Sequence, residues 1–171
     1  YPQEVQAIIG LDPTVPAIVE NSLELPTKAE LNLMYMVSRI GISRFMPSAD
    51  VEVNFPVLAG GHLSEEDKDQ FLAVFYRSSY TKNMLSEVNY LEANAAKVKA
   101  NSVPVDTPMY FFLSDGRDVG ANDWQEVLTD YLSGIQVGEY KLLDSGHYVH
   151  HEQPAIIADE MKLFIARFAN N

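Results

Sequence analysis

The sequence predicts an α/β fold: three parallel strands with flanking helices, and an all-helical insert between the first strand and the second. Three observations support this prediction. Three short, nearly all-apolar runs each end at a turn signal, as strands buried on both faces of a parallel sheet do. The second and third runs alternate with helical patterns, which is typical of right-handed crossover units. Residues 14–103, between the first run and the second, show helical patterns.

Each predicted strand is recognised by its apolar composition and by the residues that stop it. The runs are residues 5–11 (VQAIIGL), 109–114 (MYFFLS) and 139–143 (EYKLL). The turn residues that follow them are Asp12-Pro13, Asp115-Gly116 and Ser145-Gly146. Because these residue types favour turns, each strand is expected to open into a loop at its carboxyl end.

Two helices are predicted around the third strand. In residues 122–134 the apolar positions recur at helical spacing: Trp124, Val127, Leu128, Tyr131 and Leu132. Asn122 or Asp123 can accept hydrogen bonds from the first-turn amides, and Gly134 can take a left-handed conformation at the end. Pro154 suits the first position of the last helix. The apolar stripe of that helix is Ile157, Met161, Phe164, Ile165 and Phe168.

The insert is predicted to contain three main helices. Thr27 and Glu30 form a capping-box pattern that opens a helix to about Phe45, and Ser64 opens another to about Tyr80. In a third helix, apolar residues alternate spacings of four and three, over a length too short for a coiled coil. The chain is therefore divided into residues 1–13 (first core strand), 14–103 (helical insert) and 104–171 (last core strands and helices).

Composition limits the classes of function. The chain has 171 residues, a hydrophobic share of 47% and a formal net charge of −12. Because a surface this acidic repels nucleic acid, a nucleic-acid partner is not expected. There is no cysteine, which excludes disulfides and thiolate metal sites. No apolar run approaches the ~20 residues of a membrane span, and no signal peptide is evident, so a cytoplasmic protein is expected.

Polar side chains that could take part in a reaction follow the predicted strands. Asp12 follows the first, Asp115 and Asp118 follow the second, and His147 follows the third. Ligands of open parallel sheets bind beyond the carboxyl ends of the strands. A carboxylate on one strand end can fix the tautomer of an imidazole on another and stabilise its protonated form, which makes the histidine a general base.

Three segments, in order along the chain, resemble the α/β-hydrolase fold family. "GHYVHHEQPAIIADEMKLFI" is similar to the family's histidine loop and last helix, and "PMYFFLSDGRD" to its acid-bearing segment. "VQAIIGLDPTVP" is similar to the strand just before the family's cap domain, so the helical insert resembles that cap. The Gly-His segment is the most specific of the three.

The resemblance implies roles for individual residues. His147 matches the family's catalytic base, and Asp118 matches the acid, which usually lies three residues beyond the one that ends the strand. That residue is often Gly in the family and is Asp115 here, so Asp115 stays a rival. Asp12 is a third candidate, because some members carry the acid after the earlier strand.

The family's nucleophile is missing from this chain. It sits on a Gly-x-Ser-x-Gly elbow, no such pentapeptide occurs here, and Ser43 and Ser114 have the wrong neighbours. Because the chain begins with Tyr1, we expect it to be the C-terminal part of a longer protein. The strand at residues 5–11 is then expected to pair, along its free edge, with the missing N-terminal segment or with a second copy.

The expected function is that of a serine hydrolase acting on an ester or amide with an apolar tail, without a cofactor. This chain alone is expected to be inactive. The alternative is a non-catalytic α/β-hydrolase-like binding or interaction module. No metal site is expected: His147, His150 and His151 lie before Pro154, where the last helix is predicted to start, so they lack helical ligand spacing.

Overall fold

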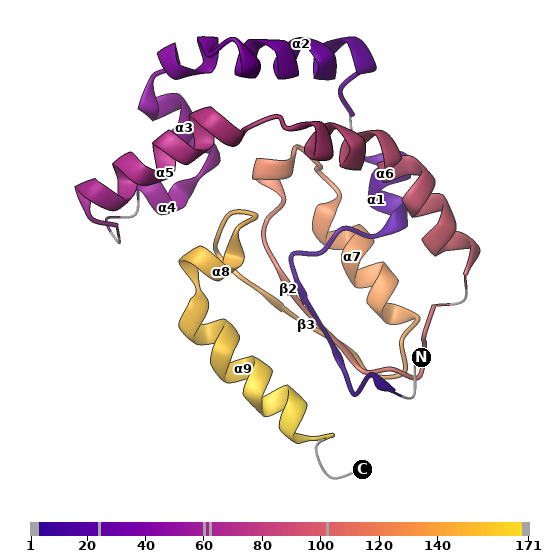
Figure 1. Ribbon diagram of the computed structural model, residues 1–171. Coiled ribbons are helices and arrows are strands. Elements are labelled where there is room, and N and C mark those ends of the chain that lie inside the picture. Colours follow the sequence, from indigo (N-terminus) through magenta and orange to yellow (C-terminus); the bar gives the residue numbers. More distant parts are fainter. Residues whose placement is uncertain (1–3, 24, 60, 62, 102, 169–171) are drawn as a thin grey trace. The chain divides into compact units, whose positions relative to one another are not determined.

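The computed structural model describes residues 4–23, 25–59, 61, 63–101 and 103–168 (Figure 1). The chain forms two compact units. The sheet unit comprises Tyr1–Leu23 and Asn94–Asn171, and the helical unit comprises Glu24–Ala93. The fold is therefore mixed α/β, with a helical segment between the first strand and the second, as the sequence predicts.

The sheet contains strands β1 (Ile8–Leu11), β2 (Met109–Leu113) and β3 (Gly138–Leu142). Within the described residues their order is β1-β2-β3, and both pairings are parallel, with Met109 aligned to Ile8 on one side and to Gly138 on the other. The three predicted strands are confirmed, with no end moved by more than three residues. All of β2 is buried because it lies in the middle of the sheet.

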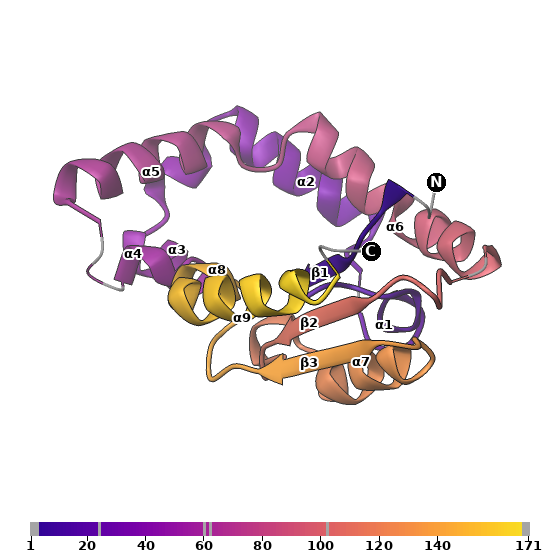
Figure 2. The same ribbon diagram turned by 90° about the horizontal axis from the view of Figure 1, so that it is seen from below.

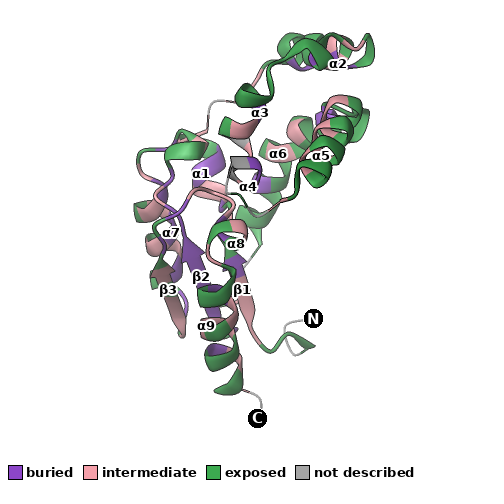
Figure 3. Cartoon of the chain, turned by 90° about the vertical axis from the view of Figure 1, so that its left-hand side faces the viewer, coloured by how far each residue is buried: buried purple, intermediate pink, exposed green. Residues whose placement is uncertain are grey.

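Helices cover both faces of the sheet, with α9 on one face and α7 on the other (Figure 2). The helices of the sheet unit are α1 (Pro16–Asn21), η3 (Arg117–Val119), α7 (Trp124–Ser133), α8 (Val149–Glu152) and α9 (Pro154–Ala166). Figure 3 shows the buried central strand between partly exposed helices. The layers are those expected of crossover units on a parallel sheet.

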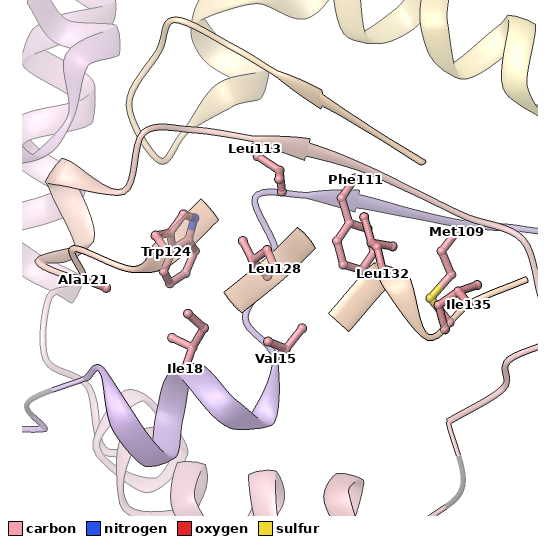
Figure 4. Packing of buried hydrophobic residues seen from close by; sticks show 10 residues of the cluster. All are labelled: Val15, Ile18, Met109, Phe111, Leu113, Ala121, Trp124, Leu128, Leu132 and Ile135. Carbon is pink, nitrogen blue, oxygen red and sulfur yellow. The ribbon is translucent and has the colours of Figure 1, made fainter. Parts of the chain in front are cut away.

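Alternating side chains of β2 build two separate cores. Met109, Phe111 and Leu113 face α1 and α7 and pack with Trp124 and Leu128 (Figure 4). The side chains of the opposite core come from β2, the residue after β3, α8 and α9: Tyr110, Phe112, Leu143, Val149, Ile157 and Phe164. The two cores fix the spacing of strands and helices, and thereby the positions of the loops at the strand ends.

The predicted ends of α7 are wrong in detail. Asp123 makes no side-chain cap; its carboxylate instead accepts a hydrogen bond from Ser22 Oγ at 2.9 Å. Gly134 has φ −83°, in the right-handed region rather than the left-handed one, and its N–H bonds to Tyr131 and Leu132. The chain therefore leaves α7 through a tightened last turn.

The other sheet-unit helices differ less from the prediction. Pro154 begins α9, as predicted. The short helix α8 before it was not predicted; it lies just ahead of Pro154. The segment at residues 16–21, predicted to belong to the insert, packs on the sheet instead, since Ile18 of α1 lies in the core with Leu128 of α7.

The helical unit consists of short helices and the first part of a long one. They are α2 (Lys28–Arg39), η2 (Ile42–Phe45), α3 (Ser48–Asn54), α4 (Pro56–Ala59), α5 (Glu65–Ser78) and α6 (Lys82–Ala100), of which α6 continues into the sheet unit. No helix among the described residues combines the length and apolarity that crossing a membrane requires.

The predicted helix starts in this unit are confirmed. Thr27 and Glu30 form the full capping box, with the Thr27 N–H donating to Glu30 Oε2 at 2.7 Å. Ser64 Oγ accepts from the Asp67 N–H at 3.2 Å. The first helix stops well before Phe45 because Gly41 adopts a left-handed conformation at φ 81°, which ends α2 and opens the separate turn η2.

Candidate active site

Polar side chains from all three strand ends meet at one edge of the sheet. Asp12 follows β1 directly, Ser114 follows β2 directly, and His147 lies in the loop after β3. Because the strands are parallel and in register, their carboxyl ends open on the same side. The structure therefore brings Asp12 and His147 together although they are 135 positions apart in the sequence.

The Asp12 carboxylate is the centre of this cluster, and it is 1% exposed. Its Oδ1 accepts hydrogen bonds from the Ser114 backbone N–H and from Trp124 Nε1, both at 2.8 Å. Its Oδ2 accepts from Ser114 Oγ at 2.7 Å and contacts His147 Nδ1 at 2.7 Å. Each carboxylate oxygen thus has two hydrogen-bonding partners, so the carboxylate is fully satisfied despite its burial.

Local backbone geometry directs Asp12 toward the other strand ends. Its N–H still donates to the Phe112 carbonyl at 2.8 Å, so the pairing with β2 continues one residue beyond β1. Its φ of 49° lies in the left-handed region, which Asp tolerates better than most residues. The chain therefore turns sharply at Asp12.

A glycine allows Trp124 to reach Asp12. Gly116 has φ 77°, and a Cβ atom placed there would lie 2.4 Å from the Trp124 Cβ. Its N–H donates to Ser114 Oγ at 3.1 Å, which leaves that hydroxyl free to donate to Asp12. The turn after β2 thus holds both Ser114 and Trp124 in place around the carboxylate.

The Asp12 carboxylate is held in its ionised form. Burial by itself raises the pKa of this carboxyl, but the hydrogen bonds from His147, Trp124 and Ser114 outweigh it and hold the pKa below its ordinary value. An ionised carboxylate only accepts hydrogen bonds, so the proton between Asp12 and His147 belongs to Nδ1.

Because Nδ1 of the His147 imidazole faces Asp12, Nε2 is directed away from that carboxylate. Its side chain is 34% exposed, and its ring lies edge-on to Trp124, with ring centres 5.8 Å apart. In the described part of the chain no hydrogen-bond partner meets Nε2. With Nδ1 protonated, a neutral imidazole carries its lone pair on Nε2, where it can accept a proton.

Asp118, which the sequence suggests as the acid, does not contact the imidazole ring. Its Oδ2 accepts from the backbone N–H of His147 at 3.2 Å. The physical reason is that Asp118 lies against the loop backbone: a Cβ on Gly146 would come within 2.1 Å of Asp118 Oδ2. Glu152 Oε1 accepts from the neighbouring Gly146 N–H at 3.0 Å. These two carboxylates hold the loop that carries His147, and Asp12 holds the ring.

Asp115, the second candidate for the acid, turns away from the histidine as well. Its Oδ1 accepts from the Arg117 N–H at 3.0 Å, and its carboxylate pairs with the Arg117 guanidinium. These hydrogen bonds lower the pKa of Asp115. Asp115 therefore stabilises the turn after β2, which is a common role for an aspartate that follows a strand.

The other histidine and serine side chains show neither a metal site nor an activated nucleophile among the described residues. Among the described residues no cluster of three metal-ligating side chains occurs. The His151 ring is partly buried, which lowers its pKa, and its Nδ1 meets no hydrogen-bond partner in the part of the chain that the structure describes. Ser43 Oγ donates to the Tyr76 carbonyl at 3.3 Å, and Ser114 Oγ donates to Asp12. Neither serine hydroxyl bonds to the His147 ring.

The sequence predicts other roles for two members of the cluster. Trp124 is predicted as part of an apolar helix stripe, and Ser114 as the end of a strand, with the wrong neighbours for a nucleophile. A buried indole N–H needs an acceptor, and this was the available signal that Trp124 would hydrogen-bond to a polar group. The sequence does not indicate which one, because Asp12 lies 112 positions away.

The comparisons with known proteins do not assign a family. No family model matches this sequence, and no solved structure matches it. A curated relative is the uncharacterized protein YbdG of Bacillus subtilis (strain 168), with 27% identity over 110 residues, or 64% of this chain and 33% of the relative. The chain thus spans about a third of the length of that relative.

Proposed function

We propose that this chain carries the acid and the base of a serine hydrolase of the α/β-hydrolase type. The observation that supports this most is the buried Asp12 carboxylate at 2.7 Å from His147 Nδ1, at the carboxyl ends of parallel strands. The pairing gives His147 the tautomer that a general base requires. A buried carboxylate that orients a partly exposed imidazole is also a frequent feature of functional sites.

In the proposed reaction, a serine hydroxyl attacks the carbonyl carbon of an ester or amide. His147 Nε2 takes the hydroxyl proton as the Oγ–C bond forms, and the Asp12 carboxylate stabilises the resulting imidazolium. His147 then returns the proton to the leaving alcohol or amine as the acyl bond breaks. Water, activated in the same way, hydrolyses the acyl-enzyme. Asp118 and Glu152 keep the histidine loop in place.

The serine of this proposal comes from a segment outside the chain, because no Gly-x-Ser-x-Gly is present. The free edge of β1 is the expected place for the strand that carries it. The outward-directed backbone groups of β1 have no partner strand within the described residues, and unpaired edges of apolar strands favour the addition of another strand.

A substrate with an apolar tail is proposed from the helical unit. That unit has an open pocket of about 410 Å³ whose lining is mainly apolar: Leu63, Asp67, Gln70, Phe71, Val74 and Phe75. Phe71 and Phe75 both pack edge-on against Phe55, which fixes their rings. Pockets of this size and composition suit alkyl or aryl groups.

The test uses a fluorophosphonate that labels activated serines. The 171-residue chain alone should not be labelled. In the longer protein that contains the elbow segment, labelling should occur, and His147→Ala should abolish it and lower the kcat for p-nitrophenyl butyrate by at least about 10³-fold. His150→Ala, an exposed neighbour on α8, is the matched control and should keep the wild-type rate.

Three results would count against the proposal. Labelling of the isolated chain would show that a nucleophile lies within it. A near-normal kcat for His147→Ala would remove this residue from the chemistry. If the longer protein shows no labelled serine at all, the non-catalytic binding module becomes the better account.

A further inference from the structure

We infer that the outer edge of β3 is a self-association surface, on which β3 of a second copy pairs antiparallel about a twofold axis at Tyr140. The proposal concerns the edge of the sheet opposite β1 and does not depend on the proposed hydrolase activity. It rests on three features of β3: the direction of its backbone groups, its exposed apolar side chains and its alternating charges.

The backbone of β3 has free hydrogen-bonding groups on its outer side. The Val137 carbonyl accepts from Met109 N at 2.9 Å, and Leu143 N donates to the Leu113 carbonyl at 2.8 Å, so these odd-numbered positions face β2. In an extended strand the groups alternate, so Gly138, Tyr140 and Leu142 direct their N–H and C=O groups outward. Within the described residues β3 is the last strand of the sheet.

Apolar side chains lie beside this free edge. Tyr140 is 49% exposed and Leu142 is 53% exposed. The strand register places them next to Phe111 and Leu113, on the face of the sheet that α7 only partly covers. An exposed edge with apolar side chains is a ready template for another strand.

The pattern along β3, Gly-Glu-Tyr-Lys-Leu, is complementary to itself when reversed. With Tyr140 opposite Tyr140 of the second copy, Glu139 lies opposite Lys141, and Leu142 lies opposite Gly138, which has no side chain. Tyr140 then forms a hydrogen-bonded pair. Glu139 and Lys141 form the adjacent non-hydrogen-bonded pair, in which the Cα atoms approach to about 4.5 Å and the side chains are closest.

The charges of β3 already belong to pairs within the chain, and these pairs extend the complementarity. Glu139 accepts from Arg167 at 2.8 Å, and Lys141 pairs with Glu160. When two copies pair, Arg167 and Glu139 of one copy are followed by Lys141 and Glu160 of the second copy. Positive and negative charges then alternate along this row. β1 has the sequence Ile-Ile-Gly-Leu and offers no such charges. A twofold contact of this kind closes on itself and gives a dimer.

The experiment is a charge exchange read by sedimentation equilibrium. Wild-type protein at tens of micromolar should be dimeric. Glu139→Lys and Lys141→Glu should each be monomeric, because like charges then face each other twice across the twofold axis. An equimolar mixture of the two variants should form a heterodimer, since each introduced charge meets an opposite one. Lys162→Glu, which breaks the exposed pair with Asp159 on α9, is the matched control and should stay dimeric.

The mixture separates the contact between copies from changes within one chain. Each variant loses an internal ion pair, and mixing does not restore that pair, so recovery of the dimer reports the contact between copies. Far-UV circular dichroism checks that both variants are folded. A monomeric wild type, dimeric single variants or a monomeric mixture would each overturn the proposal.

Discussion

Replacing Asp12 with asparagine is expected to lower kcat/KM by about 10⁴-fold in the protein that contains the nucleophile, with a loss of fold stability that is small beside this loss of rate. The expectation follows from how the two oxygens are used. Oδ1 accepts from the Ser114 N–H and from Trp124, whereas Oδ2 faces Ser114 Oγ and His147 Nδ1. Asparagine can keep its oxygen in the first position and place its NH₂ group in the second.

The NH₂ group reverses the hydrogen bond to the histidine. It would donate to Nδ1, so the neutral imidazole would carry its proton on Nε2 instead. Nε2 could then no longer accept the proton of a serine hydroxyl. The side chain would remain in place while the base lost its function, which is why the rate should fall far more than the stability.

The control is Asp118→Asn. Asp118 accepts a hydrogen bond from the backbone N–H of His147, and the asparagine carbonyl oxygen can still accept that hydrogen bond. A loss of less than about 10-fold is expected, since one hydrogen bond to a neutral donor is worth about 1 kcal/mol. The opposite order, a large loss for Asp118→Asn and a small one for Asp12→Asn, would identify Asp118 as the acid, as the sequence resemblance implies.

Replacing Asp12 with alanine is expected to lower the free energy of unfolding by about 2–5 kcal/mol. The change removes the acceptor of Trp124 Nε1 and of the Ser114 N–H, and both residues are 1% exposed. A buried donor left without an acceptor costs about 1–3 kcal/mol. Urea unfolding followed by Trp124, the single tryptophan of the chain, measures the loss.

The ionisation of the Asp12 carboxyl should also appear in the pH dependence of the free energy of unfolding. The pKa of Asp12 is lowered in the folded state, so its contribution is fully present above the unfolded pKa of about 4 and is lost as pH falls through the folded value. The difference in unfolding free energy between wild type and Asp12→Asn should therefore shrink as pH falls below about 4. A difference that grows toward acid pH would mean that the carboxyl is neutral in the folded protein.

Much of the fold could be predicted from the sequence because its signals are local. The strands were visible as apolar runs, and the starts of α2, α5 and α9 as caps at Thr27, Ser64 and Pro154. The ends were less predictable. Gly41 stops α2 early with a positive φ, whereas Gly134 stays right-handed, and no residue pattern separates these two glycines before their tertiary contacts are known.

The site was only partly predictable, for a different reason. The placement of His147 after the third strand follows from strand order, and parallel pairing brings the strand ends together. Which aspartate meets the ring depends on side-chain direction. The left-handed turn at Asp12 directs its carboxylate across β2, and the close approach of Asp118 to Gly146 directs the other carboxylate to the backbone. Neither feature can be read from residue spacing.

The most direct test of the account is the protonation of the His147 ring, because every proposal for the site depends on its hydrogen bond to Asp12. Proton–nitrogen NMR of ¹⁵N-histidine-labelled protein, with His147→Gln for assignment, distinguishes the two neutral tautomers. The hydrogen bond to Asp12 predicts a protonated Nδ1 and an unprotonated Nε2 in wild type and in Asp118→Asn, and the reverse in Asp12→Asn. A wild-type ring protonated on Nε2, or one that responds to Asp118→Asn and not to Asp12→Asn, would contradict it.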